Sequence, residues 1–133
     1  MKLFLILLVA VIVLIVAPRL LAGEIIPAKD AAARVASGQA VLVDVREPAE
    51  WADSGVAEPA VLLPLSDLRG DRTEWKAFLA ANREKELILY CRSGNRSGIA
   101  ASILKKEGFT VANAGGFKHW SGAGLPVRQV KED

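Results

Sequence analysis

The chain is poor in the residues that build metal and redox sites, with one cysteine and one histidine among its 133 residues. A single thiol excludes a dithiol oxidoreductase, because no second cysteine can resolve a disulfide internally. One cysteine and one histidine also supply too few ligands for a zinc site. No Gly-Lys-Ser/Thr phosphate-binding motif is present. We therefore expect neither a metal nor another cofactor.

The chain also lacks a charge excess of either sign, since 17 Lys and Arg residues face 15 Asp and Glu residues. Lys2 and Arg19 account for the whole surplus, so acids and bases balance from Gly23 onward. Nucleic-acid binding requires a basic surface. We therefore expect no nucleic-acid partner.

The one long apolar run is at the start, where Leu3 to Ala17 contain no polar residue. About 15 residues make a helix of about 22 Å, which is short for a hydrocarbon core of about 30 Å. If Arg19 snorkels to the interface, residues 3–21 extend the span and form an uncleaved membrane anchor.

The alternative is a secretory signal peptide cleaved after Ala22, although Leu20 fits the small-x-small cleavage pattern poorly. Both interpretations divide the chain into an N-terminal segment, 1–22, and a domain, 23–133. Both also place the domain outside the cytoplasm, either membrane-anchored or periplasmic or secreted.

Short apolar strands alternate with helices through the rest of the chain. We expect strands at 40–45, 61–63, 87–90 and 110–112, and helices at 28–36, 47–52, 74–81, 98–107 and 116–121. This alternation predicts an α/β fold with a parallel sheet, in which ligands bind at the carboxyl ends of the strands.

The stretch Cys91-Arg92-Ser93-Gly94-Asn95-Arg96-Ser97 carries the chemistry, because it joins a buried strand to a helix start. Backbone N–H groups and the helix dipole converge there, and Arg92 and Arg96 add positive charge. Such a site favours the thiolate of Cys91 and can hold an anion. Gly94 permits a positive φ, and Ser97 either caps the helix or hydrogen-bonds the sulfur.

A lone cysteine after an apolar strand is more often a small buried hydrophobe than a nucleophile. The polar residues that follow Cys91, two of them arginines, argue against that interpretation, because they would be poor neighbours for a structural core residue.

The loop resembles the active-site loop of rhodanese-domain sulfurtransferases. Further segments are similar to the family's pattern: 41–46 with Glu50-Trp51, Leu63-Pro64-Leu65, Gly108-Phe109, Gly115-Gly116, Trp120 and 124–127. The resemblance covers about residues 25 to 128. It implies a three-layer fold with a central, mostly parallel sheet flanked by helices.

The resemblance also implies a sulfurtransferase. Cys91 would take the outer sulfur of thiosulfate or a similar small anionic donor as a persulfide and pass it to a thiol or cyanide. The residues from Arg92 to Ser97 would bind the donor. The six residues from Cys91 to Arg96 match the sulfurtransferases, whereas related phosphatases and arsenate reductases have a loop longer by one. A binding, regulatory or sulfur-carrier module remains the alternative.

Asp44 and Arg46 have two interpretations. Either they support the cysteine loop from the neighbouring strand end, or they form an ion pair that braces loops. We favour the ion pair, because a carboxylate next to a thiolate would raise the thiol pKa. His119 is expected to be a surface or packing residue.

The chain departs from the family where Val56 stands at the usual histidine position. Glu58-Pro59-Ala60 replace the usual Pro-Gly-Ala, and 110–116 is about one residue short. These changes concern the rim of the pocket more than the cysteine loop.

Overall fold

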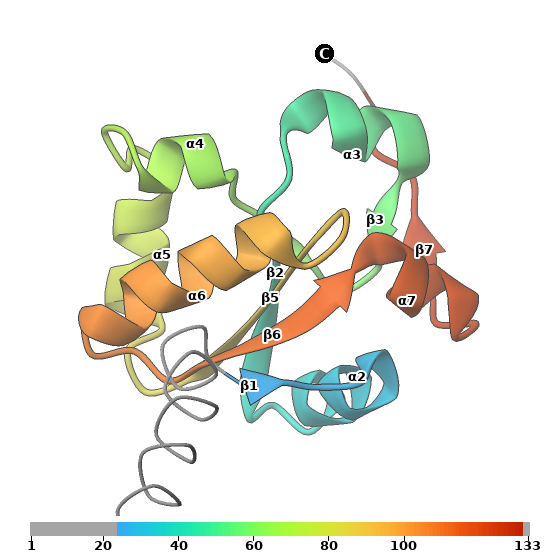
Figure 1. Ribbon diagram of the computed structural model, residues 1–133, viewed down its shortest axis with the longest axis horizontal. Coiled ribbons are helices and arrows are strands. Elements are labelled where there is room, and N and C mark those ends of the chain that lie inside the picture. Colours follow the sequence, from blue (N-terminus) through green and yellow to red (C-terminus); the bar gives the residue numbers. More distant parts are fainter. Residues whose placement is uncertain (1–23, 132–133) are drawn as a thin grey trace, which may run out of the picture.

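The computed structural model describes residues 24–131 (Figure 1). The segment 1–22, expected to be an anchor or a signal peptide, lies outside the described residues. Within 24–131, no helix is both long enough and apolar enough to cross a membrane.

Five parallel strands form the central sheet in the order β1-β6-β5-β2-β4 (Figure 1). They are β1 (Glu24–Ile25), β2 (Ala40–Asp44), β4 (Val61–Leu62), β5 (Glu86–Cys91) and β6 (Val111–Gly116). The strands β2 and β5 are apolar along most of their length, as expected of strands buried on both faces. A small antiparallel pair, β3 (Val56–Ala57) and β7 (Val127–Arg128), lies beside the sheet.

Helices cover both faces of the sheet, which gives the three layers (Figure 1). One face carries α4 (Leu65–Leu68), α5 (Trp75–Ala81) and α6 (Asn95–Lys106), and the other carries α2 (Ala28–Ala36) and α7 (Phe117–Gly122). A further helix, α3 (Pro48–Ser54), follows the carboxyl end of β2. The expected α/β fold with helices on both faces is confirmed.

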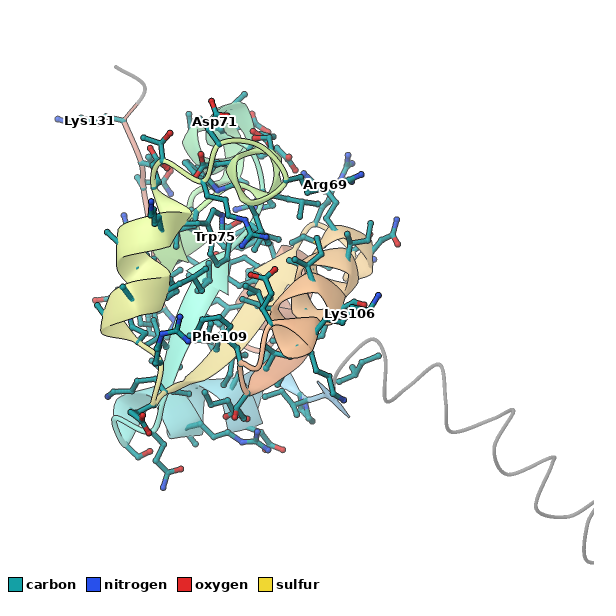
Figure 2. The ribbon with its side chains drawn as sticks, turned by 90° about the vertical axis from the view of Figure 1, so that its left-hand side faces the viewer. Arg69, Asp71, Trp75, Lys106, Phe109 and Lys131 are labelled. Atoms are coloured by element: carbon teal, nitrogen blue, oxygen red, sulfur yellow. The ribbon has the colours of Figure 1, made fainter. Side chains whose placement is uncertain are left out.

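Each face has its own apolar core, because successive strand residues point to opposite sides. Leu87 and Leu89 pack on the α6 side, whereas Ile88 and Tyr90 pack on the α2 side. On the α6 side, Trp75 is fully buried and its Nε1 donates to the carbonyl of Pro64 at 2.9 Å. Figure 2 shows Trp75 and Phe109 turned inward, with Arg69 and Lys106 on the outside.

Two elements near Cys91 differ from expectation. Helix α6 begins at Asn95 rather than Gly98, because Gly94 takes the left-handed φ of 99° and serves as its N-cap. Strand β6 continues to Gly116 rather than ending at Ala112, because β1 and β5 pair with it on either side. The short elements β1, β3, β7 and α4 were not expected.

Candidate active site

Cys91 is the last residue of β5, at the carboxyl end of the central strand. Its side chain shares the α6 face with Leu87 and Leu89 and has no exposed surface. The sulfur therefore lies beneath the loop that joins β5 to α6.

Groups of this loop donate hydrogen bonds to the sulfur. The backbone N–H of Gly94 lies 3.0 Å from Sγ, and the hydroxyl oxygen of Ser97 lies 3.3 Å from it. Ser97 is fully buried inside the first turn of α6, so of its two expected roles it has the hydrogen bond to sulfur and not the helix cap. Both donors favour a negative charge on sulfur.

The surroundings act on the thiol pKa in opposite directions. Burial raises the pKa of Cys91, but hydrogen bonds from the Ser97 hydroxyl and from the backbone N–H groups of Ser97, Ser93 and Gly94 lower it. The net result is a pKa below the ordinary cysteine value. The hydrogen-bonding cradle expected from the sequence is therefore present around Cys91.

The loop rests on the end of β6, where only glycine fits. A Cβ on Gly116 would overlap the carbonyl oxygen of Arg92 and lie 3.2 Å from Cα of Ser93. A Cβ on Gly94 would lie 3.3 Å from Cα of Gly115. The Gly115-Gly116 pair thus allows the strand backbone to approach the loop backbone closely.

Asn113 lies below the loop and was not singled out from the sequence. Its side chain is 4% exposed and contacts Gly94, Ser97 and Gly115 through hydrogen bonds. The available signal was a polar residue inside the otherwise small or apolar strand Val111–Gly116.

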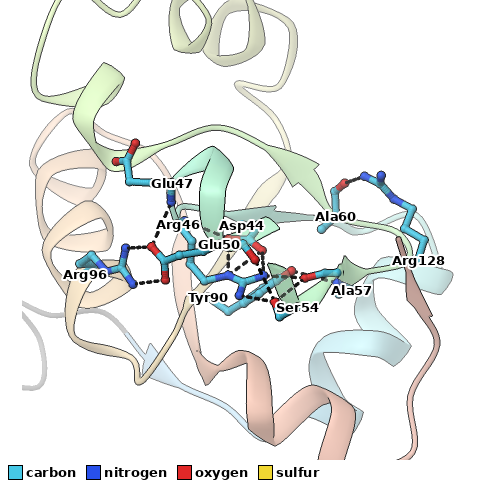
Figure 3. A network of polar contacts seen from close by, with 11 residues as sticks. Asp44, Arg46, Glu47, Glu50, Ser54, Ala57, Ala60, Tyr90, Arg96 and Arg128 are labelled. Carbon is cyan, nitrogen blue, oxygen red and sulfur yellow. Dashed lines mark hydrogen bonds and ion pairs between the residues drawn. The ribbon is translucent and has the colours of Figure 1, made fainter. Parts of the chain in front are cut away.

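The two loop arginines have different surroundings. The guanidinium of Arg96 forms a bidentate pair with Glu50 of α3, at 2.6 and 2.8 Å (Figure 3). This pair raises the pKa of Arg96 and lowers that of Glu50. Arg92 is exposed at the loop surface. Arg96 therefore ties α6 to α3, and Arg92 is the loop cation that remains available to an anion.

Asp44 and Arg46 form a buried ion pair (Figure 3). Nε and Nη2 of Arg46 donate to the Asp44 carboxylate at 2.8–3.1 Å. The remaining guanidinium donors reach Ser54 and the carbonyl of Gly55, both at 2.8 Å. The pair therefore braces the segment after α3, which is the structural interpretation favoured from the sequence.

The alternation of strand side chains explains why Asp44 does not reach the thiol. Asp44 is opposite Tyr90 in the register of β2 and β5, so it lies one position out of phase with Cys91. Arg46 stacks over the ring of Phe117, 4.7 Å from its centroid, and lies 5.9 Å from that of Tyr90. These residues belong to the α7 side of the sheet, and Cys91 belongs to the α6 side.

The other candidate residues are distributed as follows. Ser93 and Asn95 are exposed on the loop. His119 is exposed, and its Nδ1 accepts the N–H of Gly116 at 3.0 Å, so it caps α7 as a packing residue. Val56 is fully buried in β3. Among residues 24–131, no group of three or more His, Cys, Asp or Glu side chains could hold a metal ion.

A family model of the rhodanese-like domain matches residues 27–123. The chain belongs to the rhodanese-like domain family. The resemblance drawn from the cysteine loop is thus confirmed for most of the described chain. The solved structure of a rhodanese-related protein from Thermoplasma volcanium is 30% identical to this rhodanese-like domain, with a TM-score of 0.67. The match covers 80% of this chain and 99% of the Thermoplasma volcanium chain.

Curated relatives of this rhodanese-like domain include proteins named sulfurtransferases. The uncharacterized protein YqhL of Bacillus subtilis is 41% identical over 86 residues, covering 63% of this chain and 63% of YqhL. The thiosulfate sulfurtransferase PspE of Escherichia coli is 34% identical over 77 residues, covering 57% of this chain and 69% of PspE. The chain spans about half to two thirds of the length of the first curated relatives it matches.

Proposed function

We propose that this rhodanese-like domain transfers a sulfane sulfur from a small anionic donor, such as thiosulfate, to a thiol or cyanide through a persulfide on Cys91. The observation that carries the proposal is the pair of donors on Cys91 Sγ, the Gly94 N–H at 3.0 Å and the Ser97 hydroxyl at 3.3 Å. They stabilise the thiolate, which is the form that attacks sulfur. The sulfurtransferase names of relatives support the same reaction class.

The proposed reaction has two steps. The Cys91 thiolate attacks the outer sulfur of thiosulfate, a new S–S bond forms, and sulfite leaves with the electron pair of the broken bond. In the second step, a thiolate or cyanide attacks the terminal sulfur of the persulfide. The Cys91 thiolate is then released together with a new persulfide or thiocyanate. Both steps conserve electrons, so neither requires an external oxidant.

The protein supplies hydrogen-bond donors rather than a general base. The backbone N–H groups around the sulfur would stabilise the negative charge that develops on the terminal persulfide sulfur. Arg92, exposed above the loop, would attract the anionic end of the donor. Because Cys91 has no exposed surface, atoms around it must move before a donor can reach the sulfur.

The test is the intact mass of the purified full chain after thiosulfate treatment. We expect a gain of about 32 Da, one sulfur atom, that subsequent cyanide removes. A Cys91→Ser variant should fold normally and gain nothing. Because its hydroxyl is close in size to the thiol, the same thermal unfolding midpoint is expected for both proteins.

The outcomes separate the candidate functions. Sulfur uptake that survives Cys91→Ser would refute the persulfide mechanism. A reduced Cys91 that gains no sulfur from thiosulfate or from a small persulfide would favour a binding or regulatory module. Sulfur uptake with no release to cyanide or to thiols would instead favour a sulfur carrier.

A further inference from the structure

Asn113 is a buried amide in a strand whose other residues are small or apolar. The other residues of β6 are valine, alanine and glycine, and Asn113 is 4% exposed between β1 and β5. Burying an amide is costly unless it is hydrogen-bonded. The partners of Asn113 therefore indicate what the residue is there to hold.

The orientation of the carboxamide follows from two backbone partners. The carbonyl of Gly94 can only accept, so it faces Nδ2 of Asn113 at 3.0 Å. The N–H of Gly115 can only donate, so it faces Oδ1 at 2.9 Å. Oδ1 is therefore the atom that lies 2.8 Å from the hydroxyl oxygen of Ser97.

The Ser97 hydroxyl has one hydrogen and two possible acceptors. It can donate to Oδ1 of Asn113 or to Sγ of Cys91, which lies 3.3 Å away. When the sulfur is protonated, its hydrogen can point to Ser97 while Ser97 donates to Asn113. When the sulfur is ionised, the hydroxyl hydrogen turns to the sulfur, and Oδ1 keeps the N–H of Gly115.

We propose that Asn113 is a positioning residue of the sulfur-transfer site: its Nδ2 holds the Gly94 carbonyl so that the Gly94 N–H faces Cys91, and its Oδ1 holds the Ser97 hydroxyl beside the sulfur. One side chain thereby connects the loop, the first turn of α6 and the end of β6. The role of Asn113 in catalysis rests on the proposed function. Its effect on the Cys91 thiol can be measured without that function.

Other charged or titratable groups lie on the loop and on the elements next to it. They are Arg92 on the loop, the Arg96–Glu50 pair from α6 and α3, and His119 at the start of α7. Arg96 and Glu50 hydrogen-bond each other rather than Asn113, and the hydrogen bond of His119 is to Gly116. A substitution at Asn113 therefore leaves their hydrogen bonds in place.

The test compares Asn113→Leu with the native full chain by the pH dependence of Cys91 alkylation with iodoacetamide. Leucine has a similar size but no hydrogen-bonding group, so Gly94 and Ser97 lose their common support. We expect the profile to move up by about one pH unit, which is about a tenfold lower alkylation rate on the acid side. Asn82→Leu, at the end of α5, removes an amide far from the sulfur and should leave the profile unchanged.

Two further variants keep the inference falsifiable. If Asn113→Leu does not fold, Asn113→Thr provides a smaller side chain that suits a strand but cannot span the three partners. A double variant, Asn113→Leu with Ser97→Ala, tests whether Asn113 acts partly through Ser97. If it does, the double variant should shift the alkylation profile by less than the sum of the two single shifts.

An unshifted profile in a folded Asn113 variant would overturn the inference. Alkylation reports the thiol without any sulfur transfer, so this result is independent of the proposed function. If the native chain took up no sulfur, the function would fail while the effect of Asn113 on the thiol could still be measured.

Discussion

Replacing Gly116 by alanine should displace the cysteine loop, although the substitution removes none of the groups that hydrogen-bond the sulfur. The added Cβ would overlap the carbonyl oxygen of Arg92 and lie 3.2 Å from Cα of Ser93. Both neighbours are backbone atoms, so no side-chain rotation can relieve the overlap. Overpacking of this kind costs about 1–3 kcal/mol, which lowers the midpoint of thermal unfolding by roughly 4–20 °C in a domain of this size.

Gly122→Ala is the matched control, because a Cβ there has no atom within 4 Å. Gly122 is the last residue of α7, where alanine favours the helix by up to about 1 kcal/mol. We expect this variant to unfold at the same temperature as the native chain or a higher one. Thermal unfolding followed by circular dichroism, together with the rate of sulfur uptake from thiosulfate, measures both effects.

The reasoning also requires a chemical effect. Moving the loop should withdraw the Gly94 N–H from Cys91 Sγ, so Gly116→Ala should take up sulfur more slowly than Gly122→Ala at the same fraction folded. If Gly116→Ala unfolded at the native temperature and took up sulfur at the native rate, the close contact between β6 and the loop would not be what positions the donors.

Two further predictions concern the ion pairs. Glu50→Gln breaks a pair whose side chains are 31% and 30% exposed, so we expect a stability loss of at most about 1 kcal/mol in urea unfolding. Because Arg96 lowers the pKa of Glu50, the pair stabilises the fold above the ordinary carboxyl pKa and ceases to do so as the pH falls through the lowered value. The free energies of unfolding of the variant and the native chain should therefore become equal in acid. A difference that persists in acid would contradict this account. Asp44→Asn leaves Arg46 buried without its charge partner, which should cost about 3–5 kcal/mol in the same assay. The alkylation profile of Cys91 should not move, and a shift would show that Asp44 acts on the thiol after all.

The order of strand, loop and helix around Cys91 was predictable because each part has a local signal. Apolar residues fill β5, and Gly94 marks the turn by its tolerance of a positive φ. The lowered thiol pKa follows from the same local geometry, since its donors all lie within six residues of Cys91.

The rest of the site could not be predicted, because it depends on contacts between distant segments. Glu50 and Arg96 are 46 positions apart, and nothing in either sequence neighbourhood shows that the pair neutralises one of the two loop arginines. Asp44 and Cys91 end neighbouring strands, but a register offset of one residue sends their side chains to opposite faces. That offset is visible only once the strands are paired.

The inward and outward sides of the cysteine loop consist of different kinds of groups. The atoms that turn inward to the sulfur are mostly backbone N–H groups, which every residue except proline carries. The side chains of Arg92, Ser93 and Asn95 turn outward to solvent. Substitutions of those outward side chains can therefore change which molecules the loop surface attracts, while the inward surface that stabilises the thiolate stays the same.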